Sequence, residues 1–148
     1  MKKSKKILIT GGSGFLGSHV ADAFSEVGFK VTVFDKKESP WIKSNQKFIK
    51  GDILDEKLVI KSIKNADAVL HFAGSSNIDD ANKNPLQTIK HNILGTSNIL
   101  EACVKTKVPR FIFASSIYVY SEHGGFYRST KQACELLIEN YHKLKKQK

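Results

Sequence analysis

Two side chains near the end of the sequence could move a proton together. Tyr127 and Lys131 are four residues apart, so a helix would place them on one face. A phenol with an ordinary pKa of about 10 is a weak base at neutral pH, and a neighbouring ammonium favours the phenolate. Because this spacing also arises by chance, its meaning depends on the elements around it.

A second group of residues could bind a phosphate. Thr10–Gly17 reads TGGSGFLG and separates the apolar run Ile7–Ile9 from an amphipathic stretch. A strand, a glycine-rich turn and a helix in this order direct unpaired helix N–H groups at an anion. Gly11 and Gly14 permit the tight turn and close approach to a pyrophosphate, and Gly17 permits close helix packing. The alternative is a purely structural glycine turn.

An acidic residue follows at the position that a dinucleotide site requires. Lys30–Phe34 is predicted to be a strand, and Asp35 follows it about 20 residues beyond the turn. A carboxylate there accepts a hydrogen bond from the ribose 2′-OH of NAD and repels the 2′-phosphate of NADP. Lys36 and Lys37 weaken that repulsion in part, so the sequence favours NAD without excluding NADP.

Short apolar runs alternate with helical stretches along the chain, which is typical of a parallel sheet. The expected strands are Lys6–Thr10, Lys30–Phe34, Lys47–Lys50, Ala68–Phe72 and Arg110–Ser115. The expected helices are Phe15–Val27, Leu58–Lys64, Pro85–Thr106 and Tyr127–Lys145. They predict an α/β fold, a Rossmann-like doubly wound sheet of about five strands with helices on both faces. Right-handed crossovers then place the glycine turn at the carboxyl edge of the sheet.

Composition restricts the class of protein. With 148 residues, 41% of them hydrophobic, we interpret residues 1–148 as one dinucleotide-binding domain. The two cysteines and five histidines show no ligand spacing, so no metal is expected. The net charge of +10 comes mostly from lysine-rich ends, so nucleic acid is not an expected partner. No apolar run reaches the length of a membrane span, and we expect a cytoplasmic protein without a membrane partner.

Six motifs in order resemble those of the extended short-chain dehydrogenase/reductases, specifically the NAD-dependent nucleotide-sugar epimerase/dehydratase group. The resemblance covers nearly all of residues 5–142. The motifs are the TGGxGFxG turn at Thr10–Gly17, GDI at Gly51–Ile53, HxAG at His71–Gly74, NxxGT at Asn92–Thr96, SSxxVY at Ser115–Tyr120 and YxxxK at Tyr127–Lys131.

The resemblance implies three catalytic residues and NAD as the cofactor. Tyr127 would be the general base or acid on a sugar hydroxyl, and Lys131 would lower its pKa and bind the nicotinamide ribose. Ser116, three residues before Val119, would hydrogen-bond the reacting oxygen and is chosen over Ser115. The implied cofactor-binding residues are Gly11, Gly14, Phe15, Leu16, Gly17, Asp35, Asp52, Ile53, Phe72, Ala73, Gly74, Asn92, Tyr127 and Lys131.

Some of these residues also have simpler interpretations. Asp52 could simply begin a turn, and Asn92 could bond only backbone near its own helix. His71 is expected to be a packed strand residue, since the family pattern gives it no chemistry. Phe15 and Leu16 would contact the pyrophosphate through their backbone N–H groups alone.

The implied activity is that of an NAD-dependent oxidoreductase or epimerase acting on a nucleotide-activated sugar. Proton removal by Tyr127 would accompany hydride transfer to the cofactor. Ile117 and Tyr118 stand where dehydratases of the group carry an acidic pair, which disfavours dehydration. Only seven positions separate Tyr120 from Tyr127, whereas the family has a much longer segment there that helps to cover the sugar nucleotide.

The resemblance also implies a substrate-binding lobe that residues 1–148 do not include. The chain is therefore either a truncated form of a longer enzyme or a naturally short relative, expected to bind cofactor with little turnover. The alternative function is a non-catalytic NAD-binding module that senses the cofactor or regulates a partner. Because family members pair the corresponding helices, a homodimer through helices 85–106 and 127–145 is expected.

Overall fold

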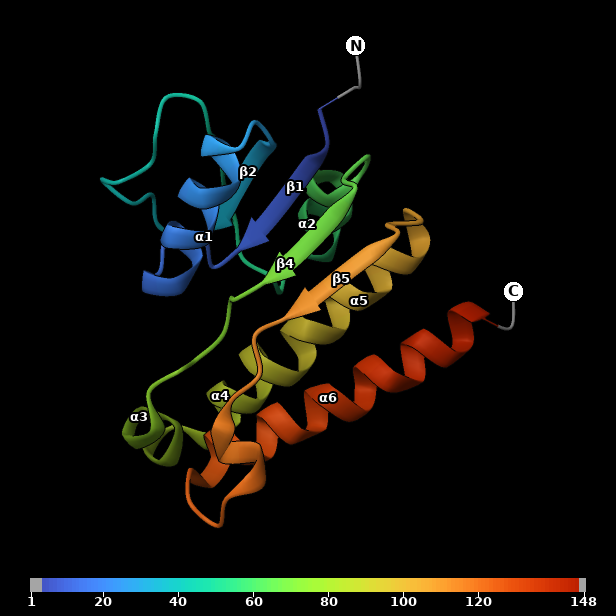
Figure 1. The fold of residues 1–148 in the computed structure, drawn as a ribbon. Helices are drawn as coiled ribbons and strands as arrows, with labels where there is room; N and C mark the ends of the chain where they lie inside the picture. The colour runs from blue at the N-terminus through green and yellow to red at the C-terminus, as the bar shows by residue number, and fades with distance from the viewer. Residues whose placement is uncertain (1–3, 147–148) are drawn as a thin grey trace.

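The computed structural model describes residues 4–146, which form a five-stranded sheet flanked by helices (Figure 1). The strands are β1 (Lys6–Thr10), β2 (Lys30–Asp35), β3 (Lys47–Lys50), β4 (Ala68–His71) and β5 (Arg110–Phe113). All neighbouring strands are parallel, in the order β3-β2-β1-β4-β5. This confirms the predicted Rossmann-like sheet. Strands β4 and β5 end slightly earlier than predicted, because the backbone leaves the sheet where it reaches the cavity described below.

The helices follow the prediction with three main differences. They are α1 (Phe15–Glu26), α2 (Glu56–Ile63), α3 (Ile78–Lys83), α4 (Pro85–Ile89), α5 (Gly95–Lys105) and α6 (Gly125–Lys146), with a π-helical turn η1 (Lys90–Leu94) and a 3-10 turn η2 (Ile117–Tyr120). The single helix expected over Pro85–Thr106 is thus divided by η1. Helix α2 begins earlier than predicted because the Asp55 side chain caps it, accepting from the Leu58 N–H at 3.0 Å.

Helix α3 was not predicted. It has only six residues, too few for a helical repeat of apolar positions to stand out. Asn77 caps its first turn by accepting a hydrogen bond from the N–H of Asp80 at 2.9 Å. Helix α3 packs against α6 and α4.

Alternating strand residues build one core on each face of the sheet. Ile7, Ile9 and Leu70 pack with Ala21 on the side of α1. On the opposite side, the core joins residues of the sheet to residues of α2 and α5. Its members include Leu8, Phe34, Val69, Val59, Ile63 and Ile99. Burying each such side chain stabilises the fold by roughly 1.5–3 kcal/mol. Helices therefore lie on both faces, as predicted, and α6 packs beside α5 (Figure 1).

The strand order determines where a ligand can bind. From β1 the chain continues to β2 on one side, and it later returns to β4 on the other side. In an open α/β sheet, such a switch point leaves a crevice at the carboxyl ends of the strands. The glycine turn after β1 lies at this edge, together with the ends of the other strands (Figure 1).

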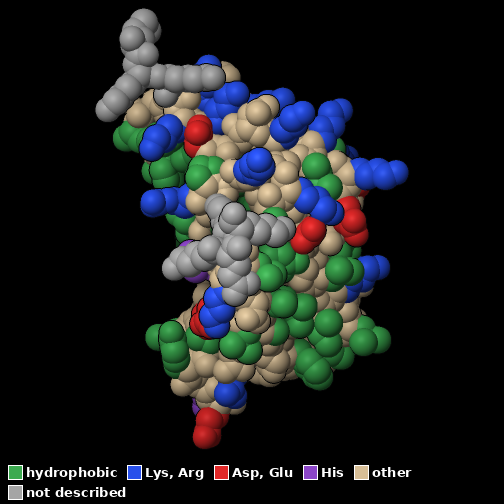
Figure 2. Space-filling model, turned by 90° about the vertical axis from the view of Figure 1, so that its right-hand side faces the viewer, with side chains coloured by type: hydrophobic (Ala, Val, Ile, Leu, Met, Phe, Trp, Pro, Cys, Tyr) green, Lys and Arg blue, Asp and Glu red, His purple; other side chains and the backbone are tan. Residues whose placement is uncertain are grey.

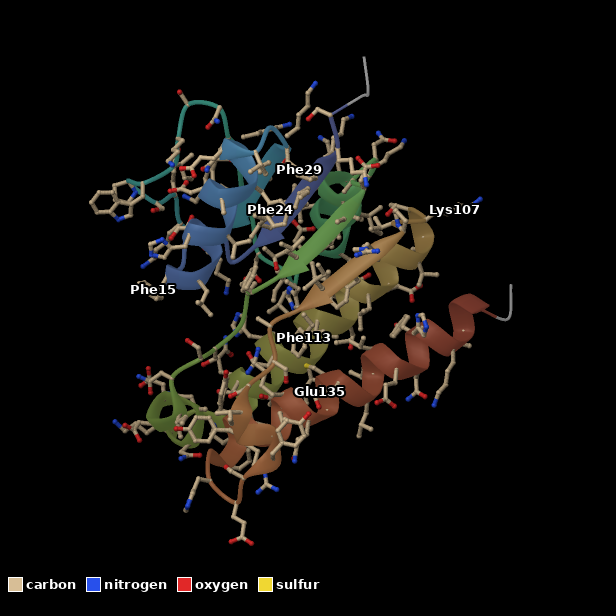
Figure 3. The ribbon with its side chains drawn as sticks, in the orientation of Figure 1. Phe15, Phe24, Phe29, Lys107, Phe113 and Glu135 are labelled. Atoms are coloured by element: carbon tan, nitrogen blue, oxygen red, sulfur yellow. The ribbon has the colours of Figure 1, made fainter. Side chains whose placement is uncertain are left out.

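The sheet is less well covered toward β5, its edge strand. Leu70 of β4 is 3% exposed, whereas its partner Ile112 in β5 is 44% exposed on the same face. Phe24 and Phe29, in contrast, lie with α1 over the β1 and β2 side (Figure 3), with their rings edge to face at 5.1 Å. One face of the sheet is thus packed at β1 and β2 and open at β5.

Residues 4–146 include no helix that is both long enough and apolar enough to cross a membrane. In the same residues, His, Cys, Asp and Glu side chains form no group of three that could hold a metal ion.

Candidate active site

A cavity of about 630 Å³ opens at the carboxyl ends of the strands. It brings together residues from the glycine turn, from the loops that follow β2, β3, β4 and β5, and from α6. The predicted site residues that line it are Gly11, Gly14, Phe15, Leu16, Gly17, Asp35, Ile53, Phe72, Ala73, Gly74, Tyr127 and Lys131. Asp52, Asn92 and Ser116 do not line it.

The glycine turn requires glycine at two positions for different reasons. Gly11 has φ +69°, and a Cβ there would lie 2.5 Å from the backbone nitrogen of Ala73. A Cβ on Gly17 would lie 2.2 Å from the carbonyl oxygen of Gly11. Both contacts are too short for a real side chain. The turn therefore brings the start of α1 and the end of β4 close to β1, and leaves a concave backbone surface between them.

Helix α1 begins at this surface. Gly14 is its N-cap residue, and no described side chain caps the helix or places an acid in its first turn. Phe15 and Leu16 are 80% and 60% exposed, and Phe15 projects from the start of α1 (Figure 3). The first turn thus directs backbone N–H groups and the positive end of the helix dipole at the cavity.

Asp35 lies at the end of β2, where backbone N–H groups hold its carboxylate. One oxygen accepts from the N–H of Ser13 at 3.1 Å, and the other accepts from the N–H of Lys37 at 3.3 Å. The acid is thereby fixed beside the glycine turn, at the edge of the cavity.

Asp52 and Ile53 follow β3 and behave differently from each other. Ile53 is buried and lines the cavity. Its side chain packs closely against the start of α5, since a Cβ on Gly95 would lie only 2.4 Å from the Cδ1 atom of Ile53. Asp52 accepts from the N–H of Leu54 at 3.0 Å and forms an ion pair with Lys36 at 3.0 Å. Burial raises the pKa of Asp52, but this backbone N–H and the Lys36 ammonium outweigh it, so the pKa lies below its ordinary value.

Asn92 lies in η1, behind the loop that follows β4. It is 3% exposed, and its side-chain oxygen accepts from the N–H of Ser75 at 2.7 Å. Its side-chain nitrogen donates to the carbonyl of Ser75 at 3.0 Å and to the hydroxyl of Thr130 at 2.9 Å. The thiol of Cys134 donates to its backbone carbonyl at 3.2 Å. The Asn92 side chain therefore joins the cavity loop to η1 and α6.

Lys131 is the most enclosed charge in the cavity. It is 7% exposed, donates to the carbonyl oxygen of Ala114 at 2.8 Å and lies 4.5 Å from the ring centre of Phe113. Its Nζ is 5.7 Å from the ring centre of Tyr127, and that ring meets Tyr118 edge to face at 6.4 Å. Burial lowers the pKa of Lys131. The predicted phenol and ammonium thus meet beside the end of β5.

The two serines after β5 point to different partners. Ser115 lines the cavity and donates to the Glu135 carboxylate at 2.5 Å. Glu135 lies on α6, and Ser115, to which it bonds, follows Phe113 at the end of β5 (Figure 3). The Ser116 hydroxyl accepts from the N–H of Tyr118 at 3.3 Å and caps η2. Ser116 therefore follows the cavity-lining Ser115 in the sequence, but Ser116 itself does not line the cavity.

His71 has a larger role than the packed strand residue that the sequence predicted. It is fully buried, and its ring nitrogens lie 2.5 Å from the Thr10 hydroxyl and 2.9 Å from the Thr96 hydroxyl. The ring also stacks on Phe113 at 5.9 Å. Burial, and to a smaller extent the charge of Lys131, lower the pKa of His71 to about 3. It is neutral at physiological pH and links β1, α5 and the end of β5.

The HxAG motif was the sequence signal for His71, but a motif does not reveal hydrogen-bond partners. Glu135 and His91 gave no signal, because the side chains that they contact at the cavity, Ser115 and Lys36, lie 20 and 55 positions away in the sequence. His91 lines the cavity and contacts Lys36.

The sheet order, the glycine turn and the acid after β2 define a Rossmann-type dinucleotide-binding protein. The chain belongs to the NAD dependent epimerase/dehydratase family, whose model matches residues 7–146. This confirms the resemblance noted in the sequence, and NAD is the cofactor of this family.

Individual relatives agree with this family. A trifunctional UDP-glucose 4,6-dehydratase/UDP-4-keto-6-deoxy-D-glucose 3,5-epimerase/UDP-4-keto-L-rhamnose-reductase of Arabidopsis thaliana is 39% identical over 134 residues, covering 81% of this chain and 20% of that protein. A UDP-glucose 4-epimerase of Yersinia enterocolitica is 35% identical over 129 residues, covering 78% of this chain and 38% of that protein. The structure of UDP-glucose 4-epimerase from Brucella ovis in complex with NAD has a TM-score of 0.87 at 28% identity, covering 93% of this chain and 48% of that one. The chain thus spans less than half the length of these proteins.

Proposed function

We propose that this chain binds NAD in the cavity and forms the cofactor-binding and proton-transfer part of an enzyme acting on a nucleotide-activated sugar. One observation carries the proposal: Tyr127 and Lys131 line the same cavity as the glycine turn and Asp35. The relatives support the substrate class, since they include UDP-glucose and dTDP-D-glucose enzymes.

The residues present fit a dinucleotide. Backbone contacts close the glycine turn at Gly11 and Gly17, whereas a Cβ on Gly14 would meet only the Gly11 carbonyl oxygen, at 3.2 Å. A diphosphate at Gly14 would meet the N–H groups of Phe15 and Leu16. Asp35 would accept hydrogen bonds from the ribose hydroxyls of the adenosine. The bound cofactor would take a hydride from a substrate carbon and return it.

Tyr127 would remove and return the proton of the sugar hydroxyl. Lys131 is held against the Ala114 carbonyl, with its ammonium 5.7 Å from the centre of the Tyr127 ring, and would bind the nicotinamide ribose. Ser116 would hydrogen-bond the reacting oxygen once its hydroxyl turned into the cavity, because its proton is free to donate while it accepts from Tyr118.

Epimerisation or simple oxidoreduction is proposed in preference to dehydration. Ile117 and Tyr118, which stand where a dehydratase has an acidic pair, form the first half of η2. Neither side chain is a carboxylic acid of the kind that this pair supplies, which disfavours dehydration.

Cofactor binding is tested by isothermal titration of NAD into the wild type and the Gly11→Ala variant. Binding is expected in the wild type and is expected to be lost in the variant, because the added Cβ would meet the backbone of Ala73. Gly28→Ala is the matched control, since Gly28 also has a positive φ, +86°, but a Cβ there meets nothing within 4 Å. Absence of NAD binding by the wild type would reject the proposed function.

The chemical role is tested by following NAD reduction with a panel of UDP- and dTDP-sugars. Tyr127→Phe removes the proton-transferring hydroxyl but keeps the ring against Tyr118. Turnover is expected to fall at least a hundredfold. Equal turnover in the variant and the wild type would reject Tyr127 as the base.

A second candidate function is a non-catalytic NAD-binding module that senses the cofactor or regulates a partner. It is favoured by the position of Ser116, whose hydroxyl caps η2 and does not line the cavity. Appreciable NAD affinity without turnover of any sugar nucleotide would support this candidate, whereas turnover by the chain would exclude it.

A homodimer through helices 85–106 and 127–145 is part of the proposal. Ile89, Leu94 and Leu136 on these helices are 38%, 48% and 61% exposed. Figure 2 shows hydrophobic side chains gathered on the lower part of one face, below a region rich in lysine and arginine. Light scattering is expected to give twice the mass of one chain, and a monomer at working concentration would reject the dimer. The cytoplasmic location stays a prediction of the sequence.

A further inference from the structure

Lys36, directly after Asp35, is held by two side chains from other parts of the fold. Its Nζ lies 3.0 Å from Oδ2 of Asp52 and 2.6 Å from Nε2 of His91. Because an ammonium only donates, Nε2 of His91 must accept, and the ring proton lies on Nδ1. Nδ1 in turn lies 3.1 Å from the carbonyl oxygen of Gln87, to which it donates. The position of Lys36 is therefore determined by the β3 loop and η1 together.

Both of these partners are themselves fixed. Asp52 uses its other oxygen to accept the N–H of Leu54 at 3.0 Å, and its pKa lies below the ordinary value, so it is charged at neutral pH. The His91 ring is fixed to its own helix through the Gln87 carbonyl. An ammonium with two fixed partners has less freedom than one on an ordinary exposed lysine.

Asp35 has a different set of partners. Its two oxygens accept from the N–H groups of Ser13 and Lys37, and it lines the cavity. Among the ion pairs of the described residues, Lys36 pairs with Asp52 and not with Asp35. The negative charge of Asp35 is therefore not neutralised by the lysine that follows it in the sequence.

We propose that Asp52 and His91 determine the cofactor preference by holding Lys36 away from the 2′ position of the adenosine ribose. A cation beside this position is what accommodates the 2′-phosphate of NADP, and Lys36 is the cavity-lining lysine next to Asp35. Held as it is, Lys36 neither neutralises Asp35 nor offers its ammonium to a phosphate. The inference rests on the proposed NAD binding and concerns only the choice between NAD and NADP.

The test is isothermal titration of NAD and of NADP into the wild type, Asp52→Asn, Lys36→Met and the double variant. Asp52→Asn keeps the side-chain shape and the acceptor for Leu54 but removes the charge that holds Lys36. The ratio of the NADP to the NAD dissociation constant is expected to fall about three- to fivefold, the size typical of a partly exposed ion pair. In the double variant the ratio is expected to return to the wild-type value, since the freed ammonium is gone.

Using the ratio separates the choice of cofactor from affinity in general, because any contact of Asp52 with the shared adenine would change both constants alike. Asp22→Asn is the matched control: it breaks the ion pair of Lys43 with Asp22, 3.2 Å long, at residues that do not line the cavity. Its ratio is expected to equal that of the wild type.

Two results would overturn the inference while leaving the proposed function intact. One is an unchanged ratio in Asp52→Asn when the wild type binds NAD. The other is a lowered ratio that persists in the double variant, which would assign the effect to Asp52 itself. A wild type that binds neither dinucleotide would overturn the proposed function, and this inference with it.

Discussion

The two halves of the cavity are built by different means. At the glycine turn, the walls are backbone in close contact: a Cβ on Gly17 would reach the Gly11 carbonyl at 2.2 Å. At the end of β5, the walls depend on side-chain hydrogen bonds from α6, those of Lys131 and Glu135. The turn half is therefore formed by the fold alone. The other half, named the catalytic half for the proposed roles of Tyr127 and Lys131, depends on individual side chains that can be removed one at a time.

The surroundings of the two halves differ in how well their side chains are packed. Beside the glycine turn, α1 and the sheet enclose a packed core. After β5, Ile117 and Tyr120 are 82% and 89% exposed, and Ile112 in the strand is open on one face. His71 connects the halves, because its ring bonds to Thr10 at the end of β1 and stacks beside Phe113 at the end of β5.

The largest effect is expected from Gly17→Ala, which would break the turn half. The new methyl group would collide with a backbone oxygen that cannot move without shifting β1 or α1. We expect the free energy of unfolding to fall by about 4 kcal/mol, measured by urea denaturation. Gly28→Ala meets nothing within 4 Å and carries only the strain of its positive φ, +86°, so it is expected to lose less stability than Gly17→Ala. A Gly17→Ala variant as stable as the wild type would contradict the close contact.

The next largest effect concerns His71 and the pH dependence of stability. Its pKa is about 3 in the folded chain and 6.5 in the unfolded chain, so between these values the unfolded chain binds the extra proton. The contribution of the neutral His71 ring to the free energy of unfolding is therefore complete above pH 6.5 and is lost as the pH falls toward 3. His71 alone is expected to cost roughly 3 kcal/mol between pH 6.5 and 4.

Urea denaturation of the wild type and His71→Gln across this pH range checks the expectation. The acid-dependent loss of stability is expected to be smaller in His71→Gln by that amount. His123→Gln serves as the control, because His123 lies exposed in a loop. Identical pH profiles for the wild type and His71→Gln would show that the ring does not stay neutral when folded.

Asn92→Ala is expected to have an intermediate effect. It decides whether Asn92 contacts the cofactor or only holds the loop that follows β4. Removing the amide would leave the half-buried N–H and carbonyl of Ser75 and the buried Thr130 hydroxyl without this partner, at a cost of about 2 kcal/mol in unfolding free energy. Urea denaturation measures this cost. Weakened NAD binding with unchanged stability would instead indicate a direct contact with the cofactor.

The smallest effect is expected in the catalytic half, from the bond between Ser115 and Glu135. A double-mutant cycle of Ser115→Ala and Glu135→Gln is expected to give a coupling of about 1 kcal/mol in unfolding free energy. Ser129→Ala, which removes a bond within α6 to the Gly125 carbonyl, provides a comparison that should not couple to Glu135→Gln. Zero coupling between Ser115 and Glu135 would mean that this bond does not hold the catalytic half together.

The turn half could be predicted from the sequence, and the catalytic half only in outline. Glycines at fixed spacing after an apolar run predict a tight backbone turn directly. Asp35 could be placed in the same way, because it stands at the end of the second predicted strand. The position of Tyr127 and Lys131 on one helix could also be predicted, because helical spacing is local, whereas their chemical roles stay a prediction. The partner of Lys131 is the Ala114 carbonyl, 17 positions away, and no local pattern encodes that contact.

The same limit applies to the fold. The five strands were found because each is a short apolar run, but η1 was not, because a π-helical turn has no signature of its own in an amphipathic stretch. The link between Lys36 and His91 spans 55 positions and exists only because β2 and η1 meet at the cavity. Local sequence therefore predicts elements and turns, whereas the pairing of side chains between elements required the structure.

The central claim, that the two halves form one NAD site, is tested most directly by a crystal structure of the chain grown with NAD. We expect the diphosphate at the N–H groups of Phe15 and Leu16, a ribose at Asp35 and the nicotinamide beside Tyr127 and Lys131. A dinucleotide bound elsewhere, or one whose nicotinamide lies away from Tyr127, would contradict the claim.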